Sequence, residues 1–388
     1  MYSSPMPYDF DLPLDRLGSD STKWRVYGPD VLPLWTADMD FRVPEPVIAA
    51  LHARVDHGVF GYCYEPPELR EVIVERLARL YAWRVPPEAI VFGTGVVSAF
   101  HRVCRVAASA GDAILVQPPV YQPILGAPAH NGSAHQEAQL VATPDGRWEI
   151  DFDAFEAAVT DRTRVFILCS PHNPVGRVFR RDELERLAAI CLRHGILICS
   201  DEIHCDLVFP GHAHTPIASL DPEIERQCVT LMAPSKTFNV PGLRCSFAVV
   251  TDPGLRGRLT GGESEWFSEV NNLGLTAALA AYRDGGEWLD QVIAYLAANR
   301  DFVADYVRRE LPGVGMTVPE ATYLAWLDCR RSGIDGNPQQ FFLERARVAL
   351  QDGAWFGPGG EGFARLNFGC TRATLAEALD RMKTALRG

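Results

Sequence analysis

The chain has 388 residues and a formal net charge of −12, with 47% of its residues apolar and 22% charged. This composition predicts a globular protein of two or three domains, and the negative charge disfavours nucleic acid or an anionic membrane as partner. Ten cysteines without a Cys-x-x-Cys pair indicate reduced thiols in a cytoplasmic protein. Secretion and membrane insertion are not expected, because residues 1–11 lack a leader pattern and four prolines break the longest charge-free stretch, 113–136.

The first part of the chain predicts an arm followed by helices. Residues 1–46 are rich in proline and aspartate and show no long periodic pattern, which indicates an extended N-terminal arm. The elements expected up to residue 81 are a strand at 32–36, a helix at 47–55, a turn at 61–64 and an amphipathic helix over 69–80.

Strand and helix patterns alternate from residue 90 to residue 250. Strands are expected at 90–92, 113–117, 164–169, 196–200, 228–232 and 245–250, and helices at 96–108 and 182–194. This alternation predicts an α/β fold in which helices cover both faces of a mainly parallel sheet. We expect this large domain to span residues 47–285.

After residue 250 the sheet pattern fades, and the remaining elements predict a smaller α+β domain over 286–388, joined by the arm of residues 1–46. Its expected elements are a long helix at 288–307, a strand at 322–327, a helix at 338–350, a strand at 364–368 and a last helix at 373–386.

Lys236 is the first candidate for chemistry. It lies in Ala-Pro-Ser-Lys-Thr-Phe-Asn, which follows an apolar run and precedes the Pro241-Gly242 break before the next strand. Desolvation disfavours an ammonium group and leaves a nucleophilic amine, so such a lysine suits covalent catalysis. The alternative is an edge lysine whose ammonium group reaches solvent, and this stretch alone leaves both interpretations open.

Three further signals precede the lysine. Gly93-Thr94-Gly95 opens a helix directly after a strand, where free backbone N–H groups favour an anion such as phosphate. Asn173 lies between two prolines after a buried strand, at the edge where parallel sheets collect ligands. Asp201 ends another buried strand and needs a cationic or N–H partner. Each feature also has a structural interpretation: a tight turn, a hydrogen-bonded turn residue and a helix cap, respectively.

Together these signals are more specific than any one of them. The order of phosphate turn, Asn173, Asp201 and then Lys236, 35 residues after Asp201, resembles the fold-type I pyridoxal-phosphate (PLP) enzymes of the aminotransferase class I/II superfamily. The resemblance spans nearly the whole chain. The arm motif Leu-Trp-Thr-Ala-Asp-Met-Asp-Phe, the Asp-Glu-Ile-His motif and the lysine motif resemble the MalY/PatB-type cystathionine β-lyases in particular.

The resemblance implies roles around the cofactor. Lys236 would form the Schiff base with PLP, Asp201 would keep the pyridine nitrogen protonated, and Tyr121 would stack on the ring. Asn173 would hydrogen-bond the phenolic oxygen. The residues implied for the phosphate are Gly95, Val96, Val97 and Ser235.

It also implies substrate contacts and a shared site. Arg365 would hold the α-carboxylate of an amino-acid substrate, with Trp35 and Asp38 as further substrate-binding candidates. Tyr62 would reach the phosphate of a neighbouring subunit's cofactor, so we expect a homodimer. No metal site is expected.

Two positions bear on the branch. His204 stands where aminotransferases usually have a tyrosine, which favours a lyase, whereas Arg244 stands where aminotransferases place a phosphate-binding arginine. The implied function is β-elimination from cystathionine or another cysteine S-conjugate to a thiol, pyruvate and ammonia. The alternatives are an aminotransferase and a specialised biosynthetic PLP enzyme, for example one performing decarboxylation-dependent oxidative deamination of an S-conjugate. Lyases of this branch can also act as regulators, but no residue pattern here marks a surface for that.

Overall fold

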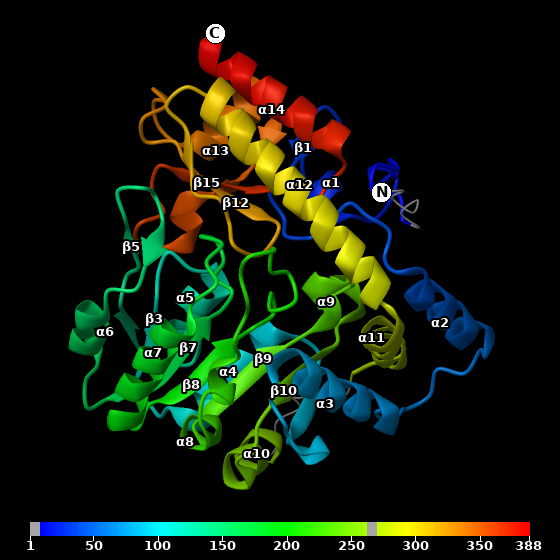
Figure 1. Ribbon diagram of the computed structural model, residues 1–388, viewed down its shortest axis with the longest axis vertical. Coiled ribbons are helices and arrows are strands. Elements are labelled where there is room, and N and C mark those ends of the chain that lie inside the picture. Colours follow the sequence, from blue (N-terminus) through cyan, green and yellow to red (C-terminus); the bar gives the residue numbers. More distant parts are fainter. Residues whose placement is uncertain (1–7, 262–269) are drawn as a thin grey trace.

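The computed structural model describes residues 8–261 and 270–388. Residues 1–7, which belong to the segment expected to lack a leader pattern, lie outside the described residues. A seven-stranded sheet forms the centre, in the order β2-β10-β9-β8-β7-β3-β4, and only β10 is antiparallel to its neighbours. This architecture confirms the predicted α/β fold with a mainly parallel sheet (Figure 1). The strands are β2 (Ile90–Gly93), β3 (Ala113–Val116), β4 (Ala134–Glu137), β7 (Thr163–Cys169), β8 (Leu197–Asp201), β9 (Cys228–Met232) and β10 (Ser246–Val249).

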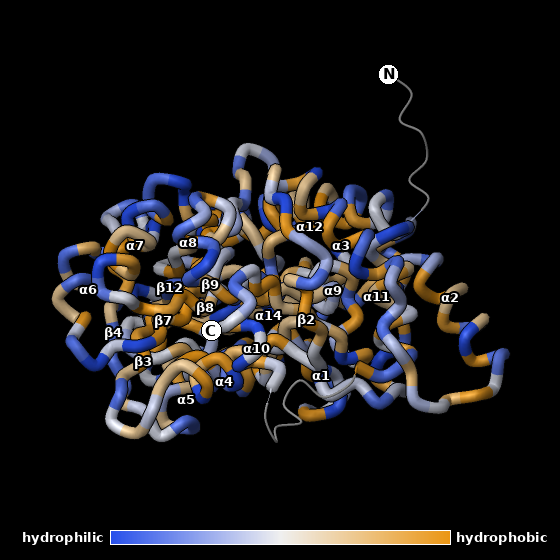
Figure 2. Tube along the Cα trace, turned by 90° about the horizontal axis from the view of Figure 1, so that it is seen from below, coloured by the Kyte–Doolittle hydropathy of each residue, from blue (hydrophilic) through white to orange (hydrophobic). Residues whose placement is uncertain are grey.

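Alternating side chains of the strands fill two apolar cores. In β7, Val165 and Ile167 belong to the cluster under α4 (Val96–Ala107), whereas Phe166 and Leu168 belong to the cluster that includes residues of α7 (Arg181–Arg193). Burial on both faces explains why β7 is a continuous apolar run in the sequence. Figure 2 shows the central strands as a mostly apolar interior.

Further helices pack around this sheet or on the helices that cover it. They are α2 (Glu45–Asp56), α3 (Pro67–Tyr81), α5 (Gln122–His130), α6 (Phe152–Ala158), α8 (Pro222–Arg226), α10 (Pro253–Thr260) and α11 (Asn272–Asp284). The sequence patterns missed α5 and α11, because α5 lies in the proline-rich stretch and α11 follows the region where the periodicity fades. They also missed a two-stranded hairpin of β5 (Val141–Ala142) and β6 (Trp148–Glu149).

The C-terminal part carries a second, antiparallel sheet with the order β11-β12-β15-β14. Its strands are β11 (Gly315–Met316), β12 (Leu324–Asp328), β14 (Gln351–Asp352) and β15 (Phe363–Asn367). The long helices α12 (Gly286–Glu310) and α14 (Arg372–Arg387) pack side by side over it (Figure 1). The predicted domain boundaries at residues 46 and 285 stay a prediction.

The arm pairs with this C-terminal part. After the short helix α1 (Thr22–Arg25), β1 (Leu32–Pro33) runs parallel to β13 (Val348–Ala349). The predicted helix at 338–350 is therefore wrong at its end: α13 (Pro338–Phe341) continues as a π-helical turn, and Arg347 then adopts a left-handed conformation with φ 54°. Pairing with the arm overrides local helix propensity there. The predicted strand at 32–36 is likewise shorter, because it ends with this pairing.

Two further observations concern membrane-spanning helices and the cysteines. Within the described residues, no helix is both long enough and apolar enough to cross a membrane. All ten cysteines are free thiols, and nine of them are buried.

Candidate active site

The predicted site residues converge on one cavity of about 700 Å³. It lies where β7 and β8 end, at Cys169 and Asp201, and the arm and Arg365 of β15 close it from the other side. This is the carboxyl edge at which α/β sheets bind ligands. The predicted residues that line the cavity are Trp35, Gly95, Val96, Val97, Tyr121, Asn173, Asp201, His204, Ser235, Lys236, Arg244 and Arg365.

Lys236 is half-buried in the third position of the short helix α9 (Pro234–Thr237). Its Nζ donates a hydrogen bond of 2.6 Å to the carbonyl oxygen of Ala37 in the arm. The pKa of Lys236 is lowered to about 8, chiefly by burial and also by the positive charge of Arg365, whereas Asp38 and Asp201 oppose this shift. A sizeable fraction of the amine is therefore neutral near pH 7 to 8, as a nucleophile or general base requires.

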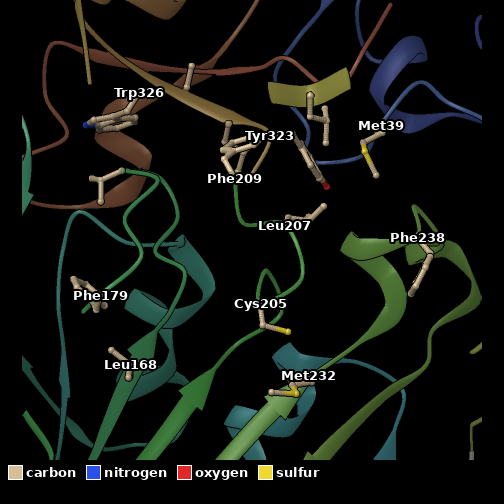
Figure 3. Close-up of a cluster of buried hydrophobic side chains, with 14 of the residues drawn as sticks. Met39, Leu168, Phe179, Cys205, Leu207, Phe209, Met232, Phe238, Tyr323 and Trp326 are labelled. Atoms are coloured by element: carbon tan, nitrogen blue, oxygen red, sulfur yellow. The ribbon is translucent and has the colours of Figure 1, made fainter. Parts of the chain in front are cut away.

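The residues after Lys236 anchor the helix on two sides. The hydroxyl of Thr237 donates to Asp206 at 2.9 Å, and Asp206 forms a 2.6 Å ion pair with Arg76 in the core. Asn239, at φ 58°, donates to the carbonyl oxygens of Met39 and Phe41 and accepts from the N–H of Met39. The lysine is thus held between the large sheet and the arm. Met39 and Phe238 belong to one buried cluster with Tyr323 (Figure 3).

Asp201 is a buried carboxylate without a cation in contact among the described residues. Its Oδ1 accepts one hydrogen bond, of 3.2 Å, from the backbone N–H of Ile203. Burial raises the pKa of Asp201 to about 7, against the lowering effect of that hydrogen bond, and the neighbouring Glu202 adds to the rise. A ligand that presents a cationic N–H group to Asp201 would therefore gain a charge-assisted hydrogen bond.

Several groups that could donate hydrogen bonds to an anion also line the cavity. Gly95 caps the 12-residue helix α4, and Val96 and Val97 of its first turn line the cavity, where backbone N–H groups have no partner within the helix. Ser235 and Arg244 line the same cavity and add a hydroxyl and a positive charge. These donors suit a phosphate group.

Arg365 is buried at the junction of three segments. Its Nη1 donates to Asn173 Oδ1 at 3.0 Å and its Nη2 to the carbonyl oxygen of Trp35 at 2.7 Å. The guanidinium lies over the Phe356 ring, 5.0 Å from its centroid. Burial lowers the pKa of Arg365 to about 10, against the raising effect of Tyr121. Within the described chain its Nε has no partner, so it can still bind a carboxylate.

Tyr121 and His204 complete the lining near the lysine. The Tyr121 ring packs edge-on to Trp355, with centroids 5.9 Å apart, and burial raises the pKa of its hydroxyl. Burial also lowers the pKa of His204 to about 3, so this histidine is neutral at physiological pH. Its Nδ1 has no hydrogen-bond partner in the described part of the chain.

Two predicted residues do not line the cavity. The side chain of Asp38 forms ion pairs with Arg16 at 3.0 Å and Lys23 at 3.6 Å, beside the Lys23–Asp40 pair at 2.8 Å. It therefore fixes the arm beside the cavity, and its contact with a substrate stays a prediction. Tyr62 lies between α2 and α3 and its side chain is fully exposed.

The lining residues that were not predicted as site residues include His101, Gln351 and Trp355. His101 lies one turn after Val97 on α4, so helical periodicity could have indicated it. Gln351 and Trp355 reach the cavity only because β14 pairs with β15, which places Gln351 opposite Arg365. No local sequence signal predicts that pairing.

Comparison with known proteins places the chain among PLP enzymes. The family model for aminotransferase class I and II matches residues 29–382. The chain is 41% identical to cystathionine beta-lyase PatB of Bacillus subtilis, covering 97% of this chain and 100% of that protein. The structure of OvoB superposes with a TM-score of 0.93 at 42% identity, covering 98% and 99% of the two chains. A PLP-bound C-S lyase from Staphylococcus hominis gives 0.92 at 31% identity and covers 98% of each chain.

The depressed pKa of Lys236 predicts a pH-dependent stability of the cofactor-free protein. Below pH 8 the lysine is charged in both states, and the folded state bears the cost of burial. Between pH 8 and 10.5 the unfolded state binds more protons, so stability rises with pH. Relative to Lys236→Met, the wild-type protein should gain about 3 kcal/mol of unfolding free energy across this window, measured by urea denaturation. A difference that stays constant with pH would contradict the depressed pKa.

Proposed function

Because the chain belongs to the aminotransferase class I and II family, we propose that it is a PLP-dependent C–S β-lyase. In this proposal it cleaves a cysteine S-conjugate, with water, to a thiol, pyruvate and ammonia. The observation that carries the proposal is the convergence of Lys236, Asp201, Asn173 and Arg365 on one cavity that the first turn of α4 also lines. The relatives named as cystathionine β-lyase and C-S lyase support the choice of reaction.

The residues of the cavity fit PLP. Asp201, a buried carboxylate with a raised pKa, suits the protonated pyridine nitrogen, and the first turn of α4 with Ser235 and Arg244 suits the phosphate. Lys236 offers the amine for the covalent link. When bound, the cofactor supplies an electron sink that stabilises negative charge at the substrate's α-carbon.

The chain's own residues would then orient the substrate and move its protons. Arg365 would hold the α-carboxylate in one pose, because a guanidinium forms two parallel hydrogen bonds where an ammonium forms one. Lys236, whose pKa lies near 8, would accept the α-proton as general base. The neutral His204 lies in the same lining and would offer an uncharged ring to the cofactor.

Product analysis separates a lyase from an aminotransferase. Incubation with cystathionine as the only substrate should release a free thiol, pyruvate and ammonia in equal amounts, with no keto-acid co-substrate. Lys236→Ala should lose nearly all turnover and all borohydride-trapped cofactor, because it removes both the base and the covalent link. Turnover that depends on an added keto acid would identify an aminotransferase, and release of carbon dioxide with oxygen uptake and peroxide formation would indicate the oxidative alternative.

Arg365→Lys tests the carboxylate contact. This change should raise KM for cysteine S-conjugates by roughly tenfold or more with cofactor content intact, since a charged hydrogen bond contributes about 1.5–3 kcal/mol. Arg381→Lys, on the exposed face of α14, is the matched control and should leave KM unchanged. An amine substrate that lacks the carboxylate should lose much less activity in Arg365→Lys. Equal losses on both substrates would mean that Arg365 supports only the fold.

We further infer a homodimer in which each subunit completes the other's site. Between α2 and α3, apolar and aromatic side chains are solvent-exposed, namely Val59, Phe60, Tyr62 and Tyr64. Exposed apolar groups of this kind are typical of interaction surfaces, and two-fold dimers are the commonest assemblies. Tyr62 does not line the cavity of its own chain, so a contact with PLP phosphate would require the partner's cavity.

Mixing variants tests the shared site. A 1:1 mixture of Tyr62→Phe and Lys236→Ala protomers, unfolded and refolded together, should regain active sites that combine one intact residue from each chain. Random pairing makes about a quarter of all sites fully competent. Tyr64→Phe is the control, because Tyr64 is similarly exposed. Its mixture with Lys236→Ala should show no more activity than the Tyr64→Phe protomers contribute on their own. If the Tyr62→Phe mixture also equals the sum of its parts, the sites are not shared.

The domain organisation and location complete the proposal. We place the domain boundary between α11 and α12, with the arm of residues 1–46 counted with the C-terminal part because β1 pairs with β13. The ten free cysteines support a reducing, cytoplasmic location.

A further inference from the structure

The proposed function accounts for every acidic, lysine and arginine side chain that lines the cavity among the described residues. Among the described residues, the cavity lining contains one acidic side chain, Asp201, and three basic ones, Lys236, Arg244 and Arg365. In the proposed lyase all four act on the cofactor or on the substrate's α-carboxylate. The lining histidines add no charge, because burial lowers the pKa of both His101 and His204.

The rest of the wall next to Arg365 consists of two indoles and one amide. Trp35 provides the carbonyl oxygen that Arg365 contacts at 2.7 Å. Gln351 is directly opposite Arg365 in the antiparallel pair of β14 and β15, so the two side chains lie on the same face of that sheet. Trp355 packs edge-on against Phe356, with centroids 5.2 Å apart, and the Phe356 ring lies under the Arg365 guanidinium. All three residues therefore surround the group that would hold the α-carboxylate.

Contacts within the chain hold the two indoles in place. The Trp35 indole N–H donates to the carbonyl oxygen of Lys23 at 3.1 Å, and its ring packs edge-on against Tyr27. Trp355 is held between Tyr121 and Phe356 and is still 38% exposed. The Gln351 side chain makes no hydrogen bond within the described chain, so its amide can both donate and accept.

We propose that the sulfur substituent of the preferred substrate is a flat, uncharged ring with a hydrogen-bonding heteroatom. This inference rests on the proposed lyase function and specifies its substrate class. The ring packs against the indoles of Trp35 and Trp355, and the Gln351 amide bonds the heteroatom. The second ammonium and carboxylate of cystathionine find no charged partner in the indoles and amide of this wall, whereas an uncharged ring needs none.

Three substrates with similar leaving thiols test the proposal: S-(pyridin-2-ylmethyl)cysteine, S-benzylcysteine and cystathionine. The kcat/KM for pyruvate release by the holoenzyme should be at least about tenfold higher for the pyridylmethyl conjugate than for cystathionine. Gln351→Ala should lower the ratio of pyridylmethyl to benzyl activity about fivefold, the loss of one neutral hydrogen bond. Trp355→Leu should lower both ring conjugates relative to cystathionine.

Gln340→Ala is the matched control, because the Gln340 amide is exposed, is bonded to Glu344 and does not line the cavity. It should leave all ratios unchanged. Cystathionine activity equal to or above that of both ring conjugates would overturn the proposal. So would an equal loss of pyridylmethyl and benzyl activity in Gln351→Ala.

A binding measurement separates this inference from the lyase function. Calorimetric titration of the Lys236→Ala variant with the same three compounds should give the same order of affinities without turnover. If no conjugate yields pyruvate, the lyase proposal fails, and the calorimetric order still decides whether the cavity prefers the heteroaromatic ring.

Discussion

The arrangement of the site depends on one backbone carbonyl, that of Ala37. It accepts a hydrogen bond from Lys236 at 2.6 Å and another from the Tyr323 hydroxyl at 2.9 Å. The first donor follows a strand of the large sheet and the second precedes a strand of the C-terminal sheet, so a single oxygen joins three distant parts of the chain. Asn239 and Asn367 donate to neighbouring carbonyls of the same arm and fix its path. A displaced arm would therefore misplace the lysine and Arg365 together, since Arg365 also contacts the arm.

The site concentrates ionisable groups whose charged forms are disfavoured by burial. The pKa of Lys236 falls to about 8, that of Arg365 falls to about 10 and that of Asp201 rises to about 7, each chiefly because of desolvation. Their surroundings in the protein do not neutralise them fully. A ligand with a phosphate, a cationic ring nitrogen and a carboxylate brings the complementary charges, and its binding relieves these costs. The cavity is thus matched to the charge pattern of its proposed cofactor and substrate.

Sequence reasoning succeeded where the determinants are local or follow chain order. The strands of the large sheet were predictable because burial on both faces leaves continuous apolar runs, as in β7. Lys236, Asp201 and Asn173 were identified because each follows such a strand, and all three line the cavity. Gln351 and Trp355 were not, because their position depends on the pairing of β14 with β15. The predicted end of the helix at 338–350 was wrong for the same reason, since β13 pairs with a strand of the distant arm.

The buried thiols have a consequence for an enzyme that releases thiols. Disulfide exchange requires a thiolate on the attacking side and access to the sulfur. Burial raises the pKa of Cys104, Cys191 and Cys245 to about 12, and nine of the ten cysteines are buried. Product thiols that oxidise in solution therefore meet few reactive thiolates on this chain with which to form a mixed disulfide. Cys63 is the only one of the ten that is half-buried, whereas the buried Cys169 and Cys245 line the cavity in which the thiol would be released.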